Sequence, residues 1–292
     1  MTGSSDAHFV AMDDGVRLRT WVAGVEPVHS TPVVLIHGGP GLPDYLAPVA
    51  AATGKLWRVH RYDQRGSGGS PWDGEHTVAR HIQDLRLLLD AWDYDRAILV
   101  GHSFGTDLVS FFQLAHPDRV AGVVYLSGPF LGPWRELTRA AERERRSNEQ
   151  QARLDELAAL MPLIGEEEVE FLTLTWFPDH ADTQQAWTWA ESAARTRRPI
   201  NYAMNRQLNA DKRVVPLESQ VEQLQAVLPP GTTIIGGDGD PRPASFLRDI
   251  AARLNCNVTI ISSAGHEPWL EQPEAFQTAF RSALTTITSH LG

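Results

Sequence analysis

The feature that most constrains the fold of this chain is a regular alternation between short apolar runs and amphipathic helical stretches. After a predicted hairpin at 8–24, the apolar runs lie within 31–39, 56–66, 96–103, 121–130, 231–240 and 257–266. The helical stretches repeat apolar residues at helical spacing and lie within 78–93, 105–120, 221–228, 244–254 and 274–291. Strands that alternate with helices need crossover connections, so the sequence predicts a mostly parallel central sheet flanked by helices.

One long segment interrupts this alternation. From Leu131 to Val214 the sequence is helical, charged and aromatic, without a clear strand, and it includes a long amphipathic stretch at 135–161. We therefore predict an α/β core built from residues 1–130 and 215–292, with a helical cap at 131–214 inserted after the sixth strand. A chain of 292 residues is long enough for such a core with an insertion.

A serine between two glycines lies where one strand should end and a helix should begin. The segment Gly101-His102-Ser103-Phe104-Gly105 has the pattern G-x-S-x-G, which marks a tight turn that exposes a nucleophilic serine. The flanking residues must be small because a Cβ atom there would strike the neighbouring strand or helix. The pattern alone arises by chance in about one chain in ten of this length. Its position between a strand and a helix favours Ser103 as a nucleophile.

A serine hydroxyl needs a base, and the base needs a carboxylate to orient it. His266 follows a glycine after the last predicted strand, and Asp240 lies after the preceding strand, in the chain order Ser, Asp, His. Asp238 is the competing acid, but the extra residues in Gly237-Asp238-Gly239-Asp240 let the side chain of Asp240 turn back over the sheet edge. We predict the triad Ser103, Asp240 and His266.

Two backbone N–H groups are candidates for binding the oxyanion that forms when serine attacks a carbonyl. One is the N–H of Phe104, directly after the nucleophile, and the other should come from the loop after the third strand. That loop reads His37-Gly38-Gly39-Pro40-Gly41, and Pro40 has no N–H to donate. Gly39 is therefore the second predicted donor.

Composition limits the kinds of binding partner and the cellular compartment that we expect. The net charge of −10 argues against a nucleic-acid binder, and the single cysteine, Cys256, excludes an intramolecular disulfide. The N-terminus lacks a leader pattern and no window is apolar enough to span a membrane, so we expect a cytoplasmic protein without membrane contact. No histidine pair has metal-ligand spacing, so we expect no metal and no cofactor. The oligomeric state is left open.

Several motifs together resemble the proline iminopeptidase (prolyl aminopeptidase) branch of the α/β-hydrolase superfamily. They are "HGGPG" at 37–41, "DQRGSGGS" at 63–70, "GHSFG" at 101–105, the Asp240 loop and "GH" at 265–266. The resemblance covers nearly the whole chain. It implies a serine hydrolase in which the cap covers the active site, and the first two motifs are the more specific to this branch.

The resemblance also suggests which cap residues contact the substrate. In these peptidases cap glutamates hold the substrate's free ammonium, and aromatic residues surround the proline ring. The segment "QAWTWAESA" at 185–193 resembles the Trp-rich cap helix, which makes Trp187, Trp189 and Glu191 the substrate-binding candidates. Ala190 intervenes between Trp189 and Glu191, and Asn201 stands near the position of the second glutamate, so the pattern departs from that of the peptidases.

The predicted function is a serine hydrolase that forms an acyl-enzyme with a small ester, lactone or amide. True release of N-terminal proline from a short peptide is the first alternative. Cleavage of a C–C bond or lyase chemistry by the same triad, and a non-catalytic receptor with a hydrolase-like pocket, are the remaining hypotheses. The acidic run Glu166–Glu170 is either a solvated helix start or another source of a substrate-binding carboxylate.

Overall fold

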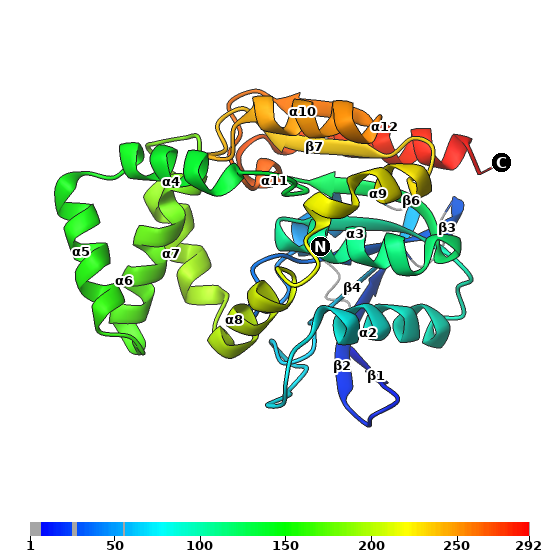
Figure 1. The fold of residues 1–292 in the computed structure, drawn as a ribbon, viewed down its shortest axis with the longest axis horizontal. Coiled ribbons are helices and arrows are strands. Elements are labelled where there is room, and N and C mark those ends of the chain that lie inside the picture. Colours follow the sequence, from blue (N-terminus) through cyan, green and yellow to red (C-terminus); the bar gives the residue numbers. More distant parts are fainter. Residues whose placement is uncertain (1–6, 25–27, 55, 292) are drawn as a thin grey trace.

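The protein is described by a computed structural model that covers residues 7–24, 28–54 and 56–291. The strands are β1 (His8–Ala11), β2 (Arg17–Ala23), β3 (His29–Ile36), β4 (Trp57–Tyr62), β5 (Ala97–His102), β6 (Val120–Leu126), β7 (Thr233–Gly237) and β8 (Asn257–Ile261). They form one eight-stranded sheet in the order β1-β2-β4-β3-β5-β6-β7-β8 (Figure 1). The pairs β1–β2 and β2–β4 are antiparallel, and the remaining pairs are parallel. The predicted mostly parallel sheet is confirmed.

Helices cover both faces of the sheet. The core helices are α1 (Ala47–Ala52), α2 (Val78–Ala91), α3 (Phe104–Ala115), α9 (Val221–Val227), α10 (Ala244–Leu254), α11 (Pro268–Glu271) and α12 (Pro273–Ser289), with a 3₁₀ turn at Pro117–Arg119. Apolar residues of α2, α3, α9 and α10 share one buried cluster, and those of α1, α11 and α12 share the other. The sheet is therefore buried on both sides, which is why its central strands are almost continuously apolar.

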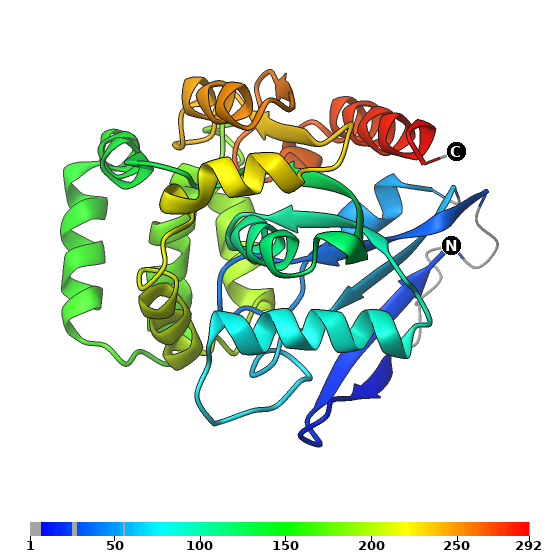
Figure 2. The ribbon, with the colours of Figure 1, turned by 45° about the vertical axis from the view of Figure 1, so that its right-hand side comes forward.

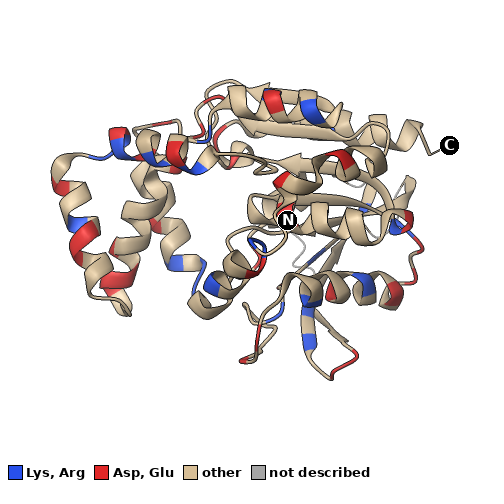
Figure 3. Ribbon diagram, in the orientation of Figure 1, with Lys and Arg blue, Asp and Glu red and all other residues tan. Residues whose placement is uncertain are grey.

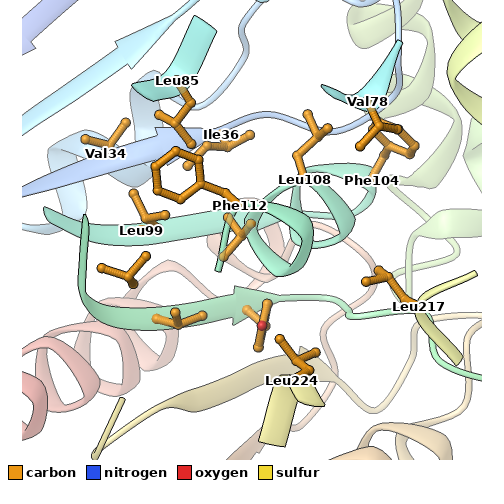
Figure 4. Close-up of a cluster of buried hydrophobic side chains, with 14 of the residues drawn as sticks. Val34, Ile36, Val78, Leu85, Leu99, Phe104, Leu108, Phe112, Leu217 and Leu224 are labelled. Carbon is orange, nitrogen blue, oxygen red and sulfur yellow. The ribbon is translucent and has the colours of Figure 1, made fainter. Parts of the chain in front are cut away.

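Helix α3 is the centre of the first cluster. Its residue Phe112 lies among Ile36 and Leu99 of the sheet and Leu85 of α2, and Leu108 belongs to the same cluster (Figure 4). Phe112 is completely buried. This packing anchors the helix whose first turn follows Ser103, so the core fixes the position of the predicted nucleophile.

The segment between β6 and β7 is helical, as predicted. It contains α4 (Trp134–Arg145), α5 (Asn148–Ala159), α6 (Gly165–Trp176), α7 (Ala186–Thr196) and α8 (Tyr202–Asp211), with 3₁₀ turns at Phe177–Asp179 and Leu217–Gln220. Helices α4 to α7 gather beyond one end of the strands (Figures 1 and 2). In contrast, α8 packs on the core, because Met204 and Leu208 belong to the cluster around α3.

The long amphipathic stretch at 135–161 is divided into α4 and α5. The division occurs at Ser147, whose hydroxyl accepts from the N–H of Gln150 while the Gln150 side chain accepts from the N–H of Ser147. This reciprocal capping box starts a new helix. Both helices carry charges of both signs (Figure 3).

The cap helices have small apolar cores of their own. Leu157 of α5 packs with Leu163 and with Leu174 of α6, and a second cluster joins α6 to α7 through Leu172 and Ala194. These clusters are much smaller than the two clusters of the core. Polar contacts also join these helices to the core: Arg145, the last residue of α4, donates to the carbonyl of Gly239 at 2.8 Å.

The motif "DQRG" braces loops beneath that site. The Asp63 carboxylate accepts from the N–H groups of Asp44 and Gly69, at 2.8 and 2.7 Å. The buried Arg65 guanidinium forms ion pairs with Asp84 and Asp14, which ties the first hairpin to α2.

In the described part of the chain, none of the helices has the length and apolar character needed to cross a bilayer.

Candidate active site

Four loops that follow parallel strands carry the residues of the candidate site. They follow β3, β5, β7 and β8, whose parallel directions bring their carboxyl ends to the same edge of the sheet. Binding sites of open α/β sheets lie at this edge. The predicted site residues lie in these loops, at the start of α3, and on α7 of the cap.

The turn at Ser103 has the predicted strained geometry. Ser103 has φ 52° and ψ −124°, a conformation that non-glycine residues rarely adopt. A Cβ atom on Gly101 would lie 2.5 Å from the carbonyl oxygen of Gly105, and one on Gly105 would lie 2.1 Å from the carbonyl oxygen of Ile36. The two glycines are therefore required by close backbone approach, and the turn places Ser103 directly before the N-terminus of α3.

The structure brings Asp240, and not Asp238, to His266. The Nδ1 of His266 lies 2.7 Å from Oδ2 of Asp240, and both side chains are buried. Asp238 instead accepts from the backbone N–H of Ser263 at 2.7 Å. Burial alone would raise the pKa of Asp240, but His266, the charge of Arg242 and the hydrogen bonds lower it to about 2. In the tautomer that donates Nδ1–H to the ionised Asp240, Nε2 of His266 carries no proton.

The two predicted oxyanion donors belong to different loops, Phe104 to the turn after β5 and Gly39 to the loop after β3. Phe104 is the first residue of α3, so its N–H has no acceptor within the helix. Gly39 lines the same cavity as Ser103 and has φ +54°. The N–H of its neighbour Gly38 is already engaged, because it donates to the hydroxyl of Tyr45 at 3.0 Å.

A cavity of about 210 Å³ lies between the core loops and the cap. It brings Ser103 and His266 together with Gly39. Its core wall also contains Leu42, Tyr45, His102, Arg242, Glu267 and Leu270, and its cap wall is formed by Glu142, Thr175, Trp176, Asp179, His180, Trp189, Ala193 and Arg197. The candidate nucleophile and base therefore face a small cavity with aromatic and charged walls.

The three predicted cap residues have different positions. Trp189 lines the cavity, next to the ring of His180 at 5.4 Å. Trp187 is 41% exposed and packs on Phe177 outside the cavity lining. The carboxylate of Glu191 also points elsewhere, because it accepts from Arg195 one helical turn later on the outer side of α7. The structure thus brings Trp189 to the cavity and leaves Trp187 and Glu191 away from it.

The acidic run at 166–170 is likewise engaged outside the cavity lining. Glu166 pairs with Arg195, Glu168 with Arg198, and Glu170 with Arg153. A different cap carboxylate, Glu142 of α4, lines the cavity instead. Burial raises the pKa of Glu142, and the charge of Asp179 acts in the same direction. The ion-pair partner of its carboxylate is Arg146, at 4.0 Å.

Two arginines of the cavity wall were missed by sequence reasoning. Arg242 forms ion pairs with Asp179 of the cap and, at 3.2 Å, with Asp240. Arg197 forms a two-pronged ion pair with Glu267, the residue after His266. Arg242 lies two residues after Asp240, and Glu267 directly follows His266. Their closeness to the predicted triad residues could have indicated Arg242 and Glu267 from the sequence. No local pattern pointed to Arg197.

Hydrogen bonds fix the backbone of His266 from three directions. Its N–H donates to the carbonyl of Asp179 at 2.8 Å. Its carbonyl accepts from the hydroxyl of Ser127 at 2.9 Å and lies 3.0 Å from Nε2 of His102. Burial lowers the pKa of His102 to about 3, so this ring is neutral and carries its proton on Nε2, the atom that must donate to a carbonyl.

The structure also limits where a metal ion would bind. Within residues 7–24, 28–54 and 56–291, no group of three or more His, Cys, Asp or Glu side chains is arranged to hold one. The charged groups of the cavity wall are instead engaged mainly with one another, as the pairs Arg242–Asp179 and Arg197–Glu267 show.

The fold and the site define the class of protein. A mostly parallel eight-stranded sheet, a strained serine turn after β5, and an acid and a histidine after β7 and β8 are the arrangement of the α/β-hydrolase fold. A model of the Alpha/beta hydrolase family matches residues 33–279, and the chain belongs to that family.

Curated relatives include several kinds of hydrolase. Epoxide hydrolase B of Mycobacterium tuberculosis is 34% identical over 133 residues, covering 44% of this chain and 37% of that protein. Proline iminopeptidase of Heyndrickxia coagulans is 34% identical over 100 residues, covering 33% of this chain and 35% of that protein. The matched regions thus span little more than a third of these relatives, and the similarity to a proline iminopeptidase agrees with the motifs.

Solved structures match over almost the whole chain. A thermophilic esterase from Thermogutta terrifontis has a TM-score of 0.71 at 20% identity, covering 97% of this chain and 99% of that chain. A proline iminopeptidase-related protein from Thermus thermophilus has a TM-score of 0.68 at 23% identity, covering 98% of this chain and 99% of that chain. At this level of identity the likeness establishes the shared fold.

Proposed function

We propose that the protein is a serine hydrolase that forms an acyl-enzyme on Ser103 with a small ester, lactone or amide, in the manner of proline iminopeptidase-like enzymes. The observation that carries the proposal is the geometry of the site. Ser103 and His266 line one cavity, and Asp240 holds Nδ1 of His266 at 2.7 Å. In this proposal helices α4 to α7 act as the cap that covers the substrate.

The reaction follows from the roles that these groups can take. His266 Nε2 accepts the Ser103 proton as the hydroxyl oxygen attacks the substrate carbonyl carbon, and Asp240 stabilises the imidazolium. The N–H groups of Gly39 and Phe104 donate to the oxyanion of the tetrahedral intermediate. His266 then protonates the leaving group, which departs and leaves the acyl-enzyme. Water, deprotonated by His266, hydrolyses the acyl-enzyme and regenerates Ser103.

The cavity supports a compact substrate. Its volume of about 210 Å³ is below the roughly 300–1,000 Å³ of pockets that hold drug-sized ligands. Trp176 and Trp189 offer apolar surface, while Leu42 and Leu270 contribute from the core side. A short acyl group with an apolar body fits these walls better than a long chain.

Release of N-terminal proline is the second candidate, and Glu142 favours it. Its carboxylate lines the cavity, and its ion-pair partner among the described residues is the distant Arg146, at 4.0 Å. A substrate ammonium would supply a closer positive charge. In this version Glu142 takes the role that the sequence assigned to Glu191.

Epoxide opening and a purely binding role find less support. Epoxide hydrolase B is a relative, but epoxide opening on this fold uses a carboxylate nucleophile, and this chain has Ser103 at the turn. A non-catalytic receptor would not need Asp240 and His266 held at 2.7 Å. C–C hydrolases and lyases of this fold use a serine triad and stay open as outcomes of a substrate survey.

The test compares the wild-type protein with Ser103→Ala on uncharged aryl esters of increasing chain length and on amino-acyl anilides that include proline. We expect turnover of short esters, and a loss of at least about 10³-fold in kcat in the variant. A variant that keeps wild-type turnover would contradict the proposed nucleophile. Turnover of the prolyl anilide alone would favour the aminopeptidase.

A second variant separates the two candidates. If Glu142 anchors an ammonium, Glu142→Gln raises KM for amino-acyl substrates and leaves KM for neutral esters unchanged. Glu191→Gln is the matched control, because Glu191 is another cap carboxylate but is held by Arg195 outside the cavity lining. Equal effects of Glu142→Gln on both substrate sets would exclude the anchor role.

A further inference from the structure

We propose that Arg197 is a positioning residue through which the cap fixes the relative position of two catalytic loops. These are the base loop at His266 and the oxyanion loop at Gly39. The inference rests on the proposed function. Arg197 directly follows α7, the helix that contributes Trp189 and Ala193 to the cavity wall. Its guanidinium contacts one residue from each catalytic loop.

The first contact is with the base loop. The two terminal nitrogens of Arg197 donate to the two carboxylate oxygens of Glu267, at 2.5 and 2.7 Å. Burial alone would raise the pKa of Glu267, but the charge of Arg197 and its hydrogen bonds lower it to about 2. A two-pronged pair fixes direction as well as distance. Because Glu267 is bonded to His266 along the chain, the pair restrains the base itself.

The second contact is with the oxyanion loop. The guanidinium carbon of Arg197 lies 4.2 Å from the centre of the Tyr45 ring, a distance typical of a stacked cation–π contact. The hydroxyl of Tyr45 accepts from the N–H of Gly38, at 3.0 Å. Gly38 directly precedes Gly39, the proposed oxyanion donor. The position of the Tyr45 ring therefore sets where this glycine loop lies.

A chain of hydrogen bonds joins the two contacts beneath the cavity. The Tyr45 hydroxyl donates to Nδ1 of His102 at 2.6 Å, and Nε2–H of His102 donates to the carbonyl of His266 at 3.0 Å. Arg197, Tyr45, His102 and the His266–Glu267 segment thus form a closed ring of contacts. His102, the residue before the nucleophile, therefore links one catalytic loop to the other through its two hydrogen bonds.

The same stretch of the cap contains a natural contrast. Arg195 lies two residues before Arg197 and also forms a two-pronged ion pair, with Glu166 at 2.9 and 2.8 Å. Both partners of that pair belong to the cap, and both are exposed. Arg195 therefore matches Arg197 in chemistry and in neighbourhood but pairs within the cap instead of with a catalytic loop.

The experiment measures kcat, KM and melting temperature of Arg197→Met, Arg197→Lys and Arg195→Met with a short aryl ester. Misplacement of a catalytic group by about 1 Å can cost about 100-fold in rate. We expect Arg197→Met to lower kcat about 10- to 100-fold with KM within about threefold. Arg197→Lys should recover part of this loss, because an ammonium still pairs with Glu267. Arg195→Met should keep kcat within about twofold.

Glu267→Gln and the double variant Arg197→Met/Glu267→Gln complete the test. If the pair acts as a unit, the double variant loses no more activity than Arg197→Met alone. The rate of Ser103 phosphonylation by a fluorophosphonate should fall with kcat, since it needs the same two loops. If Arg197→Met does not fold, Arg197→Lys and Glu267→Gln carry the test, with losses of at least about threefold expected.

Two outcomes would overturn the inference. One is an Arg197→Met enzyme with kcat within twofold of wild type. The other is a loss of kcat that Arg195→Met reproduces, which would indicate general weakening of the cap. Failure of the proposed function has a different signature: the wild-type protein would then hydrolyse none of the esters or anilides, or Ser103→Ala would keep full activity.

Discussion

The proposed catalytic loops of the core and the helices of the cap reach the same cavity by different physical means. In the core, backbone contacts leave few options: Gly101 and Gly105 have no room for a Cβ atom, and Ser103 adopts a strained conformation between them. In the cap, side chains reach inward from helices held together by small apolar clusters and surface ion pairs.

This difference predicts which substitutions alter the backbone of the site and which alter only the cavity wall. A substitution in a core loop alters backbone geometry on which the proposed chemistry depends. A substitution on the cavity side of a cap helix changes the wall and leaves the helix intact. We therefore expect variants of the core loops to affect kcat, and variants of the cap wall to affect KM, with Arg197 as the exception that links the two regions.

The largest expected effect is that of Asp240→Asn. The amide would present the wrong partner to Nδ1 of His266, and loss of the orienting carboxylate in a serine triad lowers kcat by about 10⁴-fold. Steady-state kinetics with the best ester substrate measure the change. Asp238→Asn is the matched control, because Asp238 bonds the Ser263 N–H in the same loop region. Comparable losses in the two variants would contradict the assignment of the acid.

The next effect concerns stability and compares the two regions directly. Phe112→Ala removes a completely buried ring from the core, and we expect the free energy of unfolding to fall by about 3–5 kcal/mol. Leu174→Ala truncates a residue of the α5–α6 cluster. We expect it to loosen the cap while the sheet stays folded.

Hydrogen exchange measures this difference strand by strand. Amides of α5 and α6 should exchange faster in Leu174→Ala, with β5 and β6 unchanged, because the cap cluster is separate from the core clusters. Uniform acceleration across the whole chain would show that cap and core unfold as one unit, and the comparison would then fail.

A smaller effect comes from buried histidines, which belong to the core. Burial lowers the pKa of His60 to about 4, and the charge of Arg58 makes a smaller contribution in the same direction. A histidine with a depressed folded-state pKa stabilises the fold fully above its unfolded value of 6.5 and loses that contribution as the pH falls from 6.5 toward 4. Such a group adds up to about 1.4 kcal/mol of slope per pH unit in this window.

Urea unfolding at several pH values tests the contribution of His60. We expect the free energy of unfolding of the wild type to fall steadily below pH 6.5. In His60→Gln the slope should be shallower by about 1 kcal/mol per pH unit. Identical slopes in the two proteins would show that His60 does not titrate as its burial requires.

The smallest effect compares two tryptophans on one cap helix. Trp189 lines the cavity, whereas Trp187 is 41% exposed and packs on Phe177. Trp189→Ala should raise KM about tenfold, since loss of aromatic contact costs on the order of 1.4 kcal/mol, and should leave kcat nearly unchanged. Trp187→Ala should keep KM within about twofold. The reverse ranking would place the substrate on the other side of α7.

The sequence predicted the sheet, and marked the loops proposed to be catalytic, because both depend on local patterns. The glycines around Ser103 report a steric requirement between neighbouring backbones, and the apolar runs of the central strands report their burial on both faces. The choice of Asp240 over Asp238 also followed from the loop itself, because two extra residues allow its side chain to reach His266.

The cap could not be predicted to the same depth. Which side of α7 faces the cavity depends on how the helix docks, and Trp187, Trp189 and Glu191 all lie within one helix without a local signal that ranks them. The contacts of Arg197 with Glu267 and Tyr45 join residues far apart in the chain. Such pairs are set by tertiary packing alone.

The most direct test of the central claim is to trap the covalent intermediate. The protein is mixed with a short aryl ester, quenched in acid during the first turnovers, digested and analysed by mass spectrometry. The account predicts an acyl group on the peptide that contains Ser103, absent in Ser103→Ala. Turnover without acylation of Ser103, or an acyl or alkyl group on a carboxylate side chain instead, would contradict it.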